Sequence, residues 1–414
     1  MKRGAGIRGL SMGMSLAAAI GLAAMTGPAR ADEAAAKLAA DHLYAGTLAE
    51  GDTALTAILA MDPQNGEAKI GLATVKFVRA IEKLSQGLYR YGLQQPRNSF
   101  MLPVLRLPVP VNPNPEPITY EAFRGLLSDF AADIGATEKL LGEMGPEEFK
   151  FPLDLARVRY DINGDGGFDP EESMLGVLTH VTGVGRDRMP ADLTFAFDRA
   201  DAYWLQGYCN VILGVDDFFL AYDWHESFEY TFHLFFPKSD LPFTRALDAA
   251  GPDDFTNIAD LISFLHVRWP LADAKRMSDS RAAFKKAVTL SRKDWDAIEA
   301  ETDNDREWLP NPKQTGRFAG FTVTEDRIKA WRAVLDQVDL MLDGKKLVPH
   351  WRFRQGFNLA KVFEEPRPFD IVLWVTGPAA LPYLQDGPIG TSQDWNGLAE
   401  VFEGSFGIYM AWFN

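Results

Sequence analysis

Cysteine is almost absent from this sequence. Cys209 is the only one among 414 residues, so no disulfide can form within a chain and the fold must depend on its packed core. The residues around it, in Gly-Tyr-Cys-Asn-Val-Ile-Leu, are mostly apolar and include no histidine. This setting favours a small buried side chain over a catalytic nucleophile.

Positive charge is in short supply as well. The chain has 42 lysine and arginine residues against 57 aspartate and glutamate residues, which gives a formal net charge of −15 at pH 7. A surface this acidic repels nucleic acids and anionic lipids, whereas it attracts cations. We therefore expect no nucleic-acid partner, and cations are the expected ligands.

Long apolar runs are missing except at the N-terminus. There a basic start precedes a short, glycine-rich apolar run, and the small residues Ala29 and Ala31 follow it. This order predicts a signal peptide over residues 1–31 with cleavage after Ala31, because the run is too short to span a membrane. The expected mature chain has no membrane span and is periplasmic or secreted.

Familiar enzyme motifs are missing too. Beyond residue 31 the chain contains no G-x-S-x-G nucleophile elbow, no phosphate-binding loop and no G-x-G-x-x-G dinucleotide turn. Each of these motifs positions a catalytic or phosphate-binding group locally. Many active sites are assembled from distant segments, so this result leaves an enzyme open but gives it no local candidate.

One short stretch, by contrast, is unusually rich in charge. The sequence DINGDGGFDPEES, from Asp161 to Ser173, contains five acidic side chains and three glycines. Carboxylates crowded this closely repel one another unless a cation lies between them. The candidate oxygen ligands recur at regular positions: Asp161, Asn163, Asp165, the carbonyl of Gly167, Asp169 and Glu172.

These positions resemble the twelve-residue EF-hand calcium loop, D-x-[DN]-x-[DN]-G with a glutamate at position twelve. The resemblance implies a bound Ca²⁺, which takes six to eight oxygen ligands. Gly166 would allow the sharp bend of the loop, and Glu172 would close the cage with both carboxylate oxygens. The alternative is an Asp/Gly-rich turn that is only solvated.

The flanks of the loop differ from each other. After it, apolar residues from Met174 to Val181 recur at helical spacing and predict an exiting helix. Before it, FPLDLARVRY is short, contains Pro152 and has Arg157 where the EF-hand pattern expects an apolar contact. No second loop of this pattern occurs. A lone loop with a weak entering helix predicts a structural calcium site rather than a switch.

The remaining chain is predicted to be mainly helical. Within 34–93 we expect three helices, broken at Gly51-Asp52 and at Asp62-Pro63. The piece ILAMDPQNGEAKIGLA resembles the junction between two tetratricopeptide repeats, which implies a groove for a protein partner on the N-terminal helices. An ordinary helical hairpin is the alternative for this piece.

Seven prolines between residues 96 and 117 predict an extended linker over 96–118. Further helices are expected over 119–144, 193–213, 216–235, 255–264, 280–300 and 324–343. A short hairpin is expected with its turn near Gln355-Gly356. The predicted fold is a mainly α, multi-helix globular protein with an EF-hand-like loop and a minor β-hairpin, in regions 32–95, 96–118, 119–240 and 241–414.

Three residues in DWHESFEYTFH offer a second possible metal site. His225, Glu229 and His233 follow one another at intervals of four, so neighbouring members would share a helix face. The two histidines would lie about 12 Å apart on a straight helix, too far for one ion. Only one pair with residues from elsewhere could bind a metal. The alternative is a pair of histidines at the edge of an aromatic core.

Asp198 and Asp201 are the last candidates. They could act as a carboxylate pair in acid–base chemistry, or one could cap a neighbouring turn. Together with His225 and Glu229 they define the alternative function, a periplasmic hydrolase or metal-dependent enzyme. The other alternative is a helical scaffold that calcium only stabilises. The sequence favours an exported calcium-binding protein over both, and a non-enzymatic role.

Overall fold

The computed structural model describes residues 28–94, 107–146, 148–182, 185, 192–236, 238–239, 241, 259, 262–263, 265, 268–318, 322–391, 400–402 and 406–413. These residues form a mainly helical protein with two small, two-stranded antiparallel sheets. The predicted fold class is therefore confirmed. Most of the predicted signal peptide lies outside the described residues; its last four positions begin the first helix.

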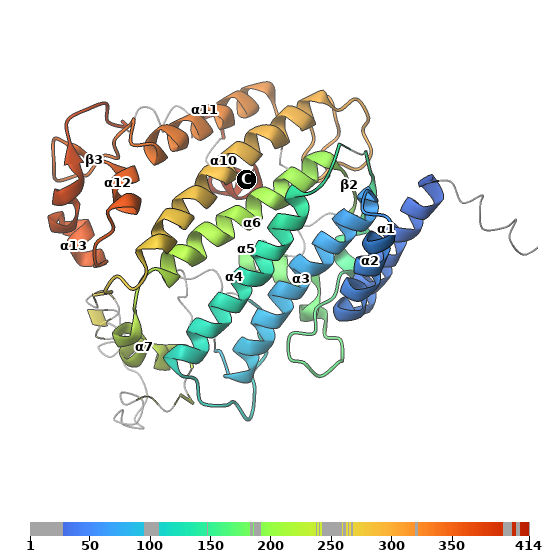
Figure 1. The fold of residues 1–414 in the computed structure, drawn as a ribbon, viewed down its shortest axis with the longest axis horizontal. Coiled ribbons are helices and arrows are strands. Elements are labelled where there is room, and N and C mark those ends of the chain that lie inside the picture. Colours follow the sequence, from blue (N-terminus) through green and yellow to red (C-terminus); the bar gives the residue numbers. More distant parts are fainter. Residues whose placement is uncertain are drawn as a thin grey trace, which may run out of the picture.

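Four long helices form the centre of the molecule and pack side by side in chain order (Figure 1). They are α3 (Gly66–Arg90), α4 (Tyr120–Gly142), α6 (Arg199–Leu220) and α10 (Ala274–Ala300). A fifth helix, α11 (Glu325–Leu342), lies against α10. Each contributes an apolar face to one hydrophobic core that extends from Ala35 to Phe413, as the helical spacing of apolar residues predicts.

Two further helices, α1 (Pro28–Ala45) and α2 (Leu48–Met61), precede α3 in the chain and pack against it. The predicted break at Gly51-Asp52 is wrong, because the chain turns at Gly46, which has a φ of +71°. Gly51 lies inside α2 instead, where a Cβ would come within 2.8 Å of the Cβ of His42. This glycine therefore permits close helix packing rather than a turn. The break at Asp62-Pro63 is confirmed.

Part of the predicted proline-rich linker, residues 95–106, lies outside the described residues. Residues 107–118 contain neither helix nor strand and run along the end of α3. There Asn112 donates a side-chain hydrogen bond to the carbonyl of Tyr89 at 2.9 Å, and Glu116 pairs with Arg90 at 2.7 Å. The segment is a strap fixed to a helix end.

The helix predicted over 193–213 starts later than expected. Its first residues form strand β2 (Thr194–Phe197), which pairs antiparallel with β1 (Phe151–Asp154), Phe151 opposite Phe197. Short apolar segments fit either structure, and here the pairing partner decides. The helix predicted over 216–235 is also wrong, since α6 continues to Leu220 and a separate helix, α7 (His225–Thr231), follows.

The C-terminal part contains short elements around a second sheet, β3 (Gly356–Phe357) with β4 (Leu384–Gln385). Val348 and Phe357 form a single antiparallel bridge with two backbone hydrogen bonds of 2.9 Å, so a minor hairpin is present. The predicted turn near Gln355-Gly356 is wrong, because Gly356 lies in β3. The predicted helix over 255–264 lies mostly outside the described residues. The described C-terminal residues also form the helices α12 (Leu359–Glu364), α13 (Ile371–Thr376), η6 (Pro378–Tyr383) and α15 (Phe406–Phe413).

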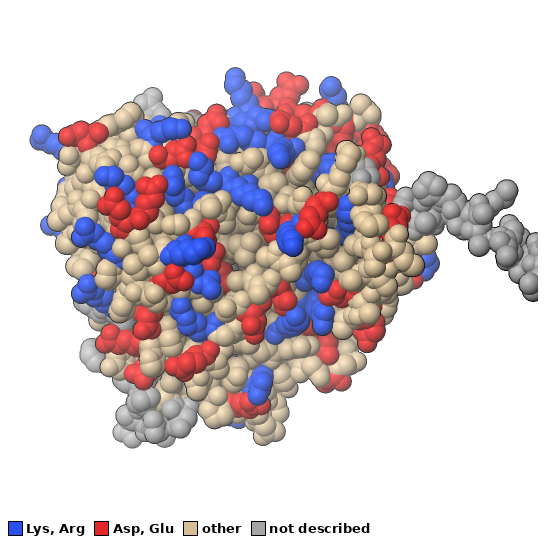
Figure 2. All heavy atoms as spheres, in the orientation of Figure 1, with Lys and Arg blue, Asp and Glu red and all other residues tan. Residues whose placement is uncertain are grey.

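The surface carries both signs of charge. Figure 2 shows lysine and arginine side chains intermixed with aspartate and glutamate over one whole face of the molecule. The negative net charge is thus not gathered into one patch on that face. Among the described residues, no helix has the length and apolar character that crossing a bilayer requires.

Candidate functional site

The EF-hand-like loop lies between a strand and a helix. The predicted exiting helix is confirmed as α5 (Met174–Thr182). In place of an entering helix, the chain passes from β1 through one turn of 3₁₀ helix, η2 (Leu155–Arg157). Arg157, which occupies an expected apolar position, places its guanidinium 4.0 Å from the ring centre of Tyr44. An aromatic face thus replaces the apolar contact.

The two flanks of the loop pair with each other. The amide of Tyr160 donates to the carbonyl of Glu172 at 2.7 Å, and that of Met174 donates to the carbonyl of Val158 at 2.9 Å. In a paired EF-hand, the apolar residue at position eight would contact a partner loop; here Phe168 is 46% exposed and packs under Arg159. The lone loop is therefore closed by its own ends.

Hydrogen bonds from the backbone bend the loop as the sequence predicts. Gly164 and Gly166 have φ values of +74° and +70°, which only glycine adopts without strain. The side chain of Asn163 accepts from the amide of Asp165 at 2.8 Å. That of Asp165 accepts from the amide of Gly167 at 2.6 Å. The short acidic and amide side chains therefore point into the turn.

Glu172 folds back across the beginning of the loop. Its side chain is buried, with 3% exposed. One oxygen, Oε1, accepts from the amides of Ile162 and Asn163 at 3.0 and 3.3 Å. The other, Oε2, accepts from the amide of Asp169 at 3.0 Å. Glu172 thus ties the end of the loop to its beginning through backbone amides.

Asp161 is fixed by helix α3. Its amide donates to Oε2 of Glu82 at 2.8 Å, and its carbonyl accepts from Nε2 of Gln86 at 2.7 Å. Oδ2 accepts from the amide of Gly166 at 3.2 Å, whereas the buried Oδ1 has no hydrogen-bond partner. Burial raises the pKa of Glu82 to about 7, and the charges of Asp161 and Glu172 add to this effect.

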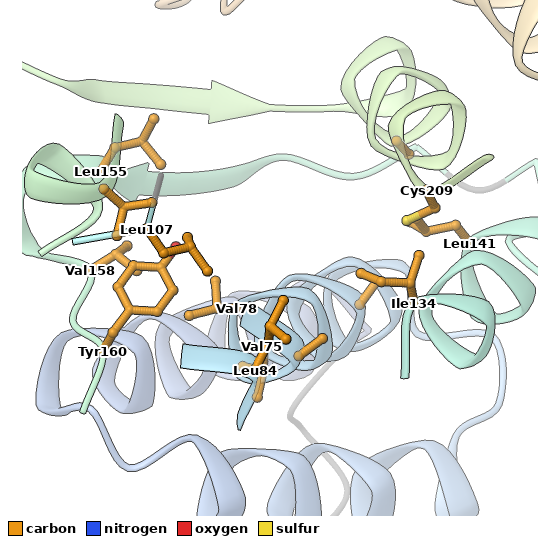
Figure 3. Close-up of a cluster of buried hydrophobic side chains, with 14 of the residues drawn as sticks. Val75, Val78, Leu84, Leu107, Ile134, Leu141, Leu155, Val158, Tyr160 and Cys209 are labelled. Atoms are coloured by element: carbon orange, nitrogen blue, oxygen red, sulfur yellow. The ribbon is translucent and has the colours of Figure 1, made fainter. Parts of the chain in front are cut away.

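Behind the loop lies part of the hydrophobic core. Figure 3 shows Tyr160 and Val158, which precede the loop, beside Val78 of α3 and Leu107 of the strap. All four side chains are buried. The first ligand position, Asp161, directly follows the buried Tyr160, so the start of the loop is anchored in the core.

The residues of the loop fit a calcium ion. An all-oxygen donor set and an orphaned, buried carboxylate oxygen both suit a hard divalent cation. No three of the loop carboxylates have oxygens within 4.8 Å of one another. Asp165 and Asp169 are exposed and hydrogen-bonded to their own turn. Rotation of these two side chains would be needed to complete the cage.

A second acidic group lies elsewhere. Oxygens of Asp198, Glu301 and Glu307 lie within 4.8 Å of one another, and among the described residues this is the one such triad of possible metal ligands. The β1–β2 register brings Lys150, just before β1, next to Asp198, just after β2. The Lys150 ammonium lies 3.0 Å from Oδ2 of Asp198 and 3.1 Å from Oδ2 of Asp303.

Asp198 and Asp201 also have a structural role. Oδ1 of Asp198 accepts from the amide of Ala200, and Oδ2 of Asp201 accepts from the amide of Asp198, each at 2.9 Å. This capping box satisfies backbone donors at the start of α6. The cap that the sequence offered as an alternative is therefore present, and both aspartates additionally face other carboxylates.

The surroundings of this triad raise the pKa of several nearby carboxyl groups. Burial raises the pKa of Glu301 to about 8, with the charge of Asp198 as the next cause. Burial and the charge of Asp198 raise the pKa of Asp201 well above its usual range. The pKa of Asp294 is raised in the same way, by burial and then by the charges of Asp201 and Glu301.

Within the part of the chain that the structure describes, the histidine-containing segment belongs to no group of three possible metal ligands. His225 and Glu229 lie 3.6 Å apart, and the His225 ring stacks on Tyr120. His233 is not on the same helix, since α7 ends at Thr231 and a 3₁₀ turn, η5 (Phe232–Leu234), follows. The histidines border an aromatic cluster, as the second interpretation of this segment expects.

The four residues of the hydrolase hypothesis are not brought together. Asp198 and Asp201 stand at the start of α6, whereas His225 and Glu229 follow its end. That helix has 22 residues and is therefore about 30 Å long. The alternative enzyme site is thus ruled out as a single site by this separation.

The scaffold hypothesis expects an exposed apolar surface on the N-terminal helices. Within the described residues 34–94, Met61 is the one large apolar side chain that is exposed. The apolar faces of α1, α2 and α3 are buried against one another and against α4.

Sequence reasoning missed Lys150, Asp294, Glu301 and Glu307. A usable signal exists for Asp294: it falls in the buried register of α10, with Ala287, Ser291 and Ile298. An acidic residue at a core position is rare unless it has a partner. No local spacing marks the other three, because they come from separate segments.

Comparison with protein-family models, with curated proteins and with solved structures finds no match. The resemblance to the EF-hand loop therefore depends on the residues from Asp161 to Glu172 themselves. Function is inferred below from the chemistry of this chain.

Proposed function

We propose that this chain is an exported calcium-binding protein whose loop from Asp161 to Glu172 holds one Ca²⁺. The observation that carries the proposal is the buried Oδ1 of Asp161, which has no hydrogen-bond partner at the first ligand position of the pattern. An unpaired carboxylate oxygen is costly to bury, and a cation would remove that cost. The ligands would be Asp161, Asn163, Asp165, the Gly167 carbonyl, Asp169 and Glu172.

The role of the ion would be structural. Its ligands come from one short segment whose ends already pair with each other, and that segment is fixed to α3 through Glu82 and Gln86. A sensor EF-hand moves two helices apart when it binds calcium. Here the entering helix is replaced by β1 and η2, so calcium would stabilise the junction between β1 and α5.

The proposed location follows from the N-terminal pattern. Residues 1–31 have the features of a signal peptide, which would direct the chain to the periplasm or the medium. Calcium is plentiful outside the cytoplasm, so a site with a dissociation constant of about 0.1–1 mM could be occupied there. The acidic surface is consistent with a cation ligand.

Calorimetric titration of chelator-treated protein with calcium would test the proposal. We expect one binding event in the wild type that Glu172→Gln weakens by more than about a hundredfold, because loss of a ligand should exceed the 10–100-fold cost of changing a residue that only supports a ligand. Glu171→Gln is the matched control, since it removes the neighbouring charge at a position without a ligand role.

Thermal melting of the same samples would measure how strongly the ion stabilises the fold. Calcium should raise the melting temperature of the wild type and of Glu171→Gln but not that of Glu172→Gln. Equal calcium affinity in Glu172→Gln and Glu171→Gln would contradict the proposal, as would the lack of any calcium-dependent heat in the wild type.

A further inference from the structure

We propose a second cation site, independent of the calcium loop, formed by the carboxylates of Asp198, Glu301 and Glu307 and taking a hard divalent metal ion. Three separate parts of the chain supply these ligands: the start of α6, the end of α10 and the loop that follows α10. Their oxygens lie within 4.8 Å of one another, close enough for one ion to contact all three.

An unpartnered side chain behind the triad supports this assignment. Asp294 is 1% exposed, and neither of its carboxylate oxygens has a hydrogen-bond partner. It lies two helical turns before Glu301, on the same face of α10. The charges that act most strongly on it are those of Asp201, Glu301 and Asp198. Asp294 thus lies without a partner on the buried face of α10 that leads to Glu301, and the charges acting on it are those of carboxylates and not of a basic side chain.

The hydrogen bonds around the triad leave oxygens available. Oδ1 of Asp198 accepts from the helix cap and Oδ2 from Lys150. Oε1 of Glu307 accepts from the amide of Asp305 at 2.8 Å, and Oε2 of Glu301 accepts from Gln314 at 3.1 Å. One oxygen of each glutamate thus has a protein donor, and the other is open for an ion.

Lys150 already offers one positive charge to this region. It pairs with Asp198 and Asp303 at the outer side of the group, and its side chain is 38% exposed. Its single charge does not balance the three carboxylates, Asp201 and Asp294 when these groups are ionised. A divalent ion among the inner carboxylates would supply the missing charge without displacing the ammonium.

The donor atoms define the class of ion. All of the proposed ligands are carboxylate oxygens, and among the described residues no histidine or cysteine belongs to the group. Carboxylates suit Mg²⁺, Ca²⁺ and Mn²⁺, whereas zinc and copper sites normally use nitrogen or sulfur. We therefore expect Mn²⁺ to serve as a probe for this site, with Mg²⁺ and Ca²⁺ as competitors.

The test counts ions in the full-length protein. Chelator-treated wild type, Glu301→Gln and Asp216→Asn would be dialysed against millimolar Mn²⁺, and bound manganese would be measured per chain. We expect Glu301→Gln to retain one ion fewer than the wild type. Asp216→Asn, which removes a buried carboxylate elsewhere on α6, should retain the same number as the wild type.

The calcium loop and the second site can be separated by adding Glu172→Gln. The proposal predicts that the Glu172→Gln protein keeps one ion and that the Glu172→Gln/Glu301→Gln protein keeps none. If the loop binds no metal at all, the wild type should bind one ion and Glu301→Gln none. The two proposals therefore fail independently of each other.

A near-isosteric change provides a second measurement. Asp294→Asn should weaken Mn²⁺ binding at this site by about tenfold or more, while circular dichroism shows a folded protein. Equal numbers of bound ions in the wild type and Glu301→Gln would overturn the proposal; the carboxylates would then be shown to share protons. Unchanged Mn²⁺ affinity in both Glu301→Gln and Asp294→Asn would overturn it as well.

Discussion

The EF-hand-like loop and the carboxylate group around Asp198 are both acidic, but they are built in opposite ways. The loop consists of consecutive residues, largely exposed, whose carboxylates accept hydrogen bonds from their own backbone. The other group combines residues that are far apart in the chain, and its inner member Asp294 has no donor at all. Carboxylates within one turn can accept hydrogen bonds from the backbone amides of that turn. Buried carboxylates that come from distant segments need a cation or a proton instead.

Because of this difference, a bound cation would have a different effect in each region. The loop carboxylates accept hydrogen bonds from backbone amides, and an ion would add direct ligation to these bonds. In the buried group, burial raises the pKa of Glu301 and Asp294, so protons and a cation would compete for the same carboxylates. We therefore expect metal removal to affect local order in the loop and the pH dependence of stability in the buried group.

A lone buried carboxyl can show how much of this behaviour comes from burial alone. Asp216 is 7% exposed, and its Oδ2 has no partner. Burial raises its pKa to about 7; the charge of Asp217 adds to this, and Arg276 and Arg124 oppose it. The folded state thus holds a proton that the unfolded chain releases above about pH 4, so the free energy of unfolding falls as the pH rises from about 4 to 7.

Asp216→Asn should remove this contribution. We expect the variant to match the wild type near pH 4 and to exceed it by up to about 4 kcal/mol at pH 8. Urea unfolding at several pH values would measure the difference. If the curves of unfolding free energy against pH run parallel for the two proteins, burial alone does not explain the raised pKa of the buried carboxyls. The contrast between Asp216 and the crowded group around Asp198 would then be larger.

Lys150→Met should reveal the repulsion within the crowded group. Removing the ammonium leaves Asp198 and Asp303 without their basic partner, and because Lys150 is partly exposed we expect a loss of about 2 kcal/mol in chelator. Lys83→Met is the matched control, since Lys83 pairs with Asp133 at 2.8 Å on a more exposed surface and should cost under about 1 kcal/mol.

Divalent ions should reduce the cost of Lys150→Met but not that of Lys83→Met. Chemical unfolding with and without added Mn²⁺ would give both values. An equal cost for the two substitutions would mean that the carboxylates near Lys150 are protonated and do not repel one another. Repulsion between carboxylates would then not distinguish the group around Asp198 from the loop.

Gly166→Ala tests whether the loop is bent before an ion arrives. An added Cβ would meet no atom within 4 Å, but the φ of +70° is unfavourable for alanine, so we expect a loss of about 1 kcal/mol in chelator. Gly125→Ala in α4, where a Cβ also meets nothing, should stabilise the helix by up to about 1 kcal/mol. No loss in Gly166→Ala would indicate that the bend forms only with calcium.

The sequence allows the helices and the loop to be predicted because their signals are local. The apolar spacing in α3, the proline after α2 and the cap at Thr324 each act within a few residues. The bend at Gly164 and Gly166 and the return of Glu172 follow from ligand spacing in the same way. The calcium ion itself stays a prediction.

Features that depend on distant partners could not be predicted. β2 becomes a strand because β1 is available to pair with it, and Gly51 stays within α2 because His42 lies against it. The carboxylate group around Asp198 needs the α6–α10 contact before its members meet. Local sequence propensity does not predict contacts of this kind. Asp294, an acidic residue at a core position of α10, is the one sequence signal that indicates such a contact.

The β1–β2 ladder has a consequence for the folding rate. The ladder pairs the segments before and after the EF-hand-like loop. The whole segment from Asp154 to Thr194 must therefore be closed into a ring when the strands pair. Closing a longer flexible ring costs more chain entropy. An ion that already fixes part of that ring would shorten the flexible remainder, and the protein would then refold faster where calcium is abundant than in a calcium-poor compartment.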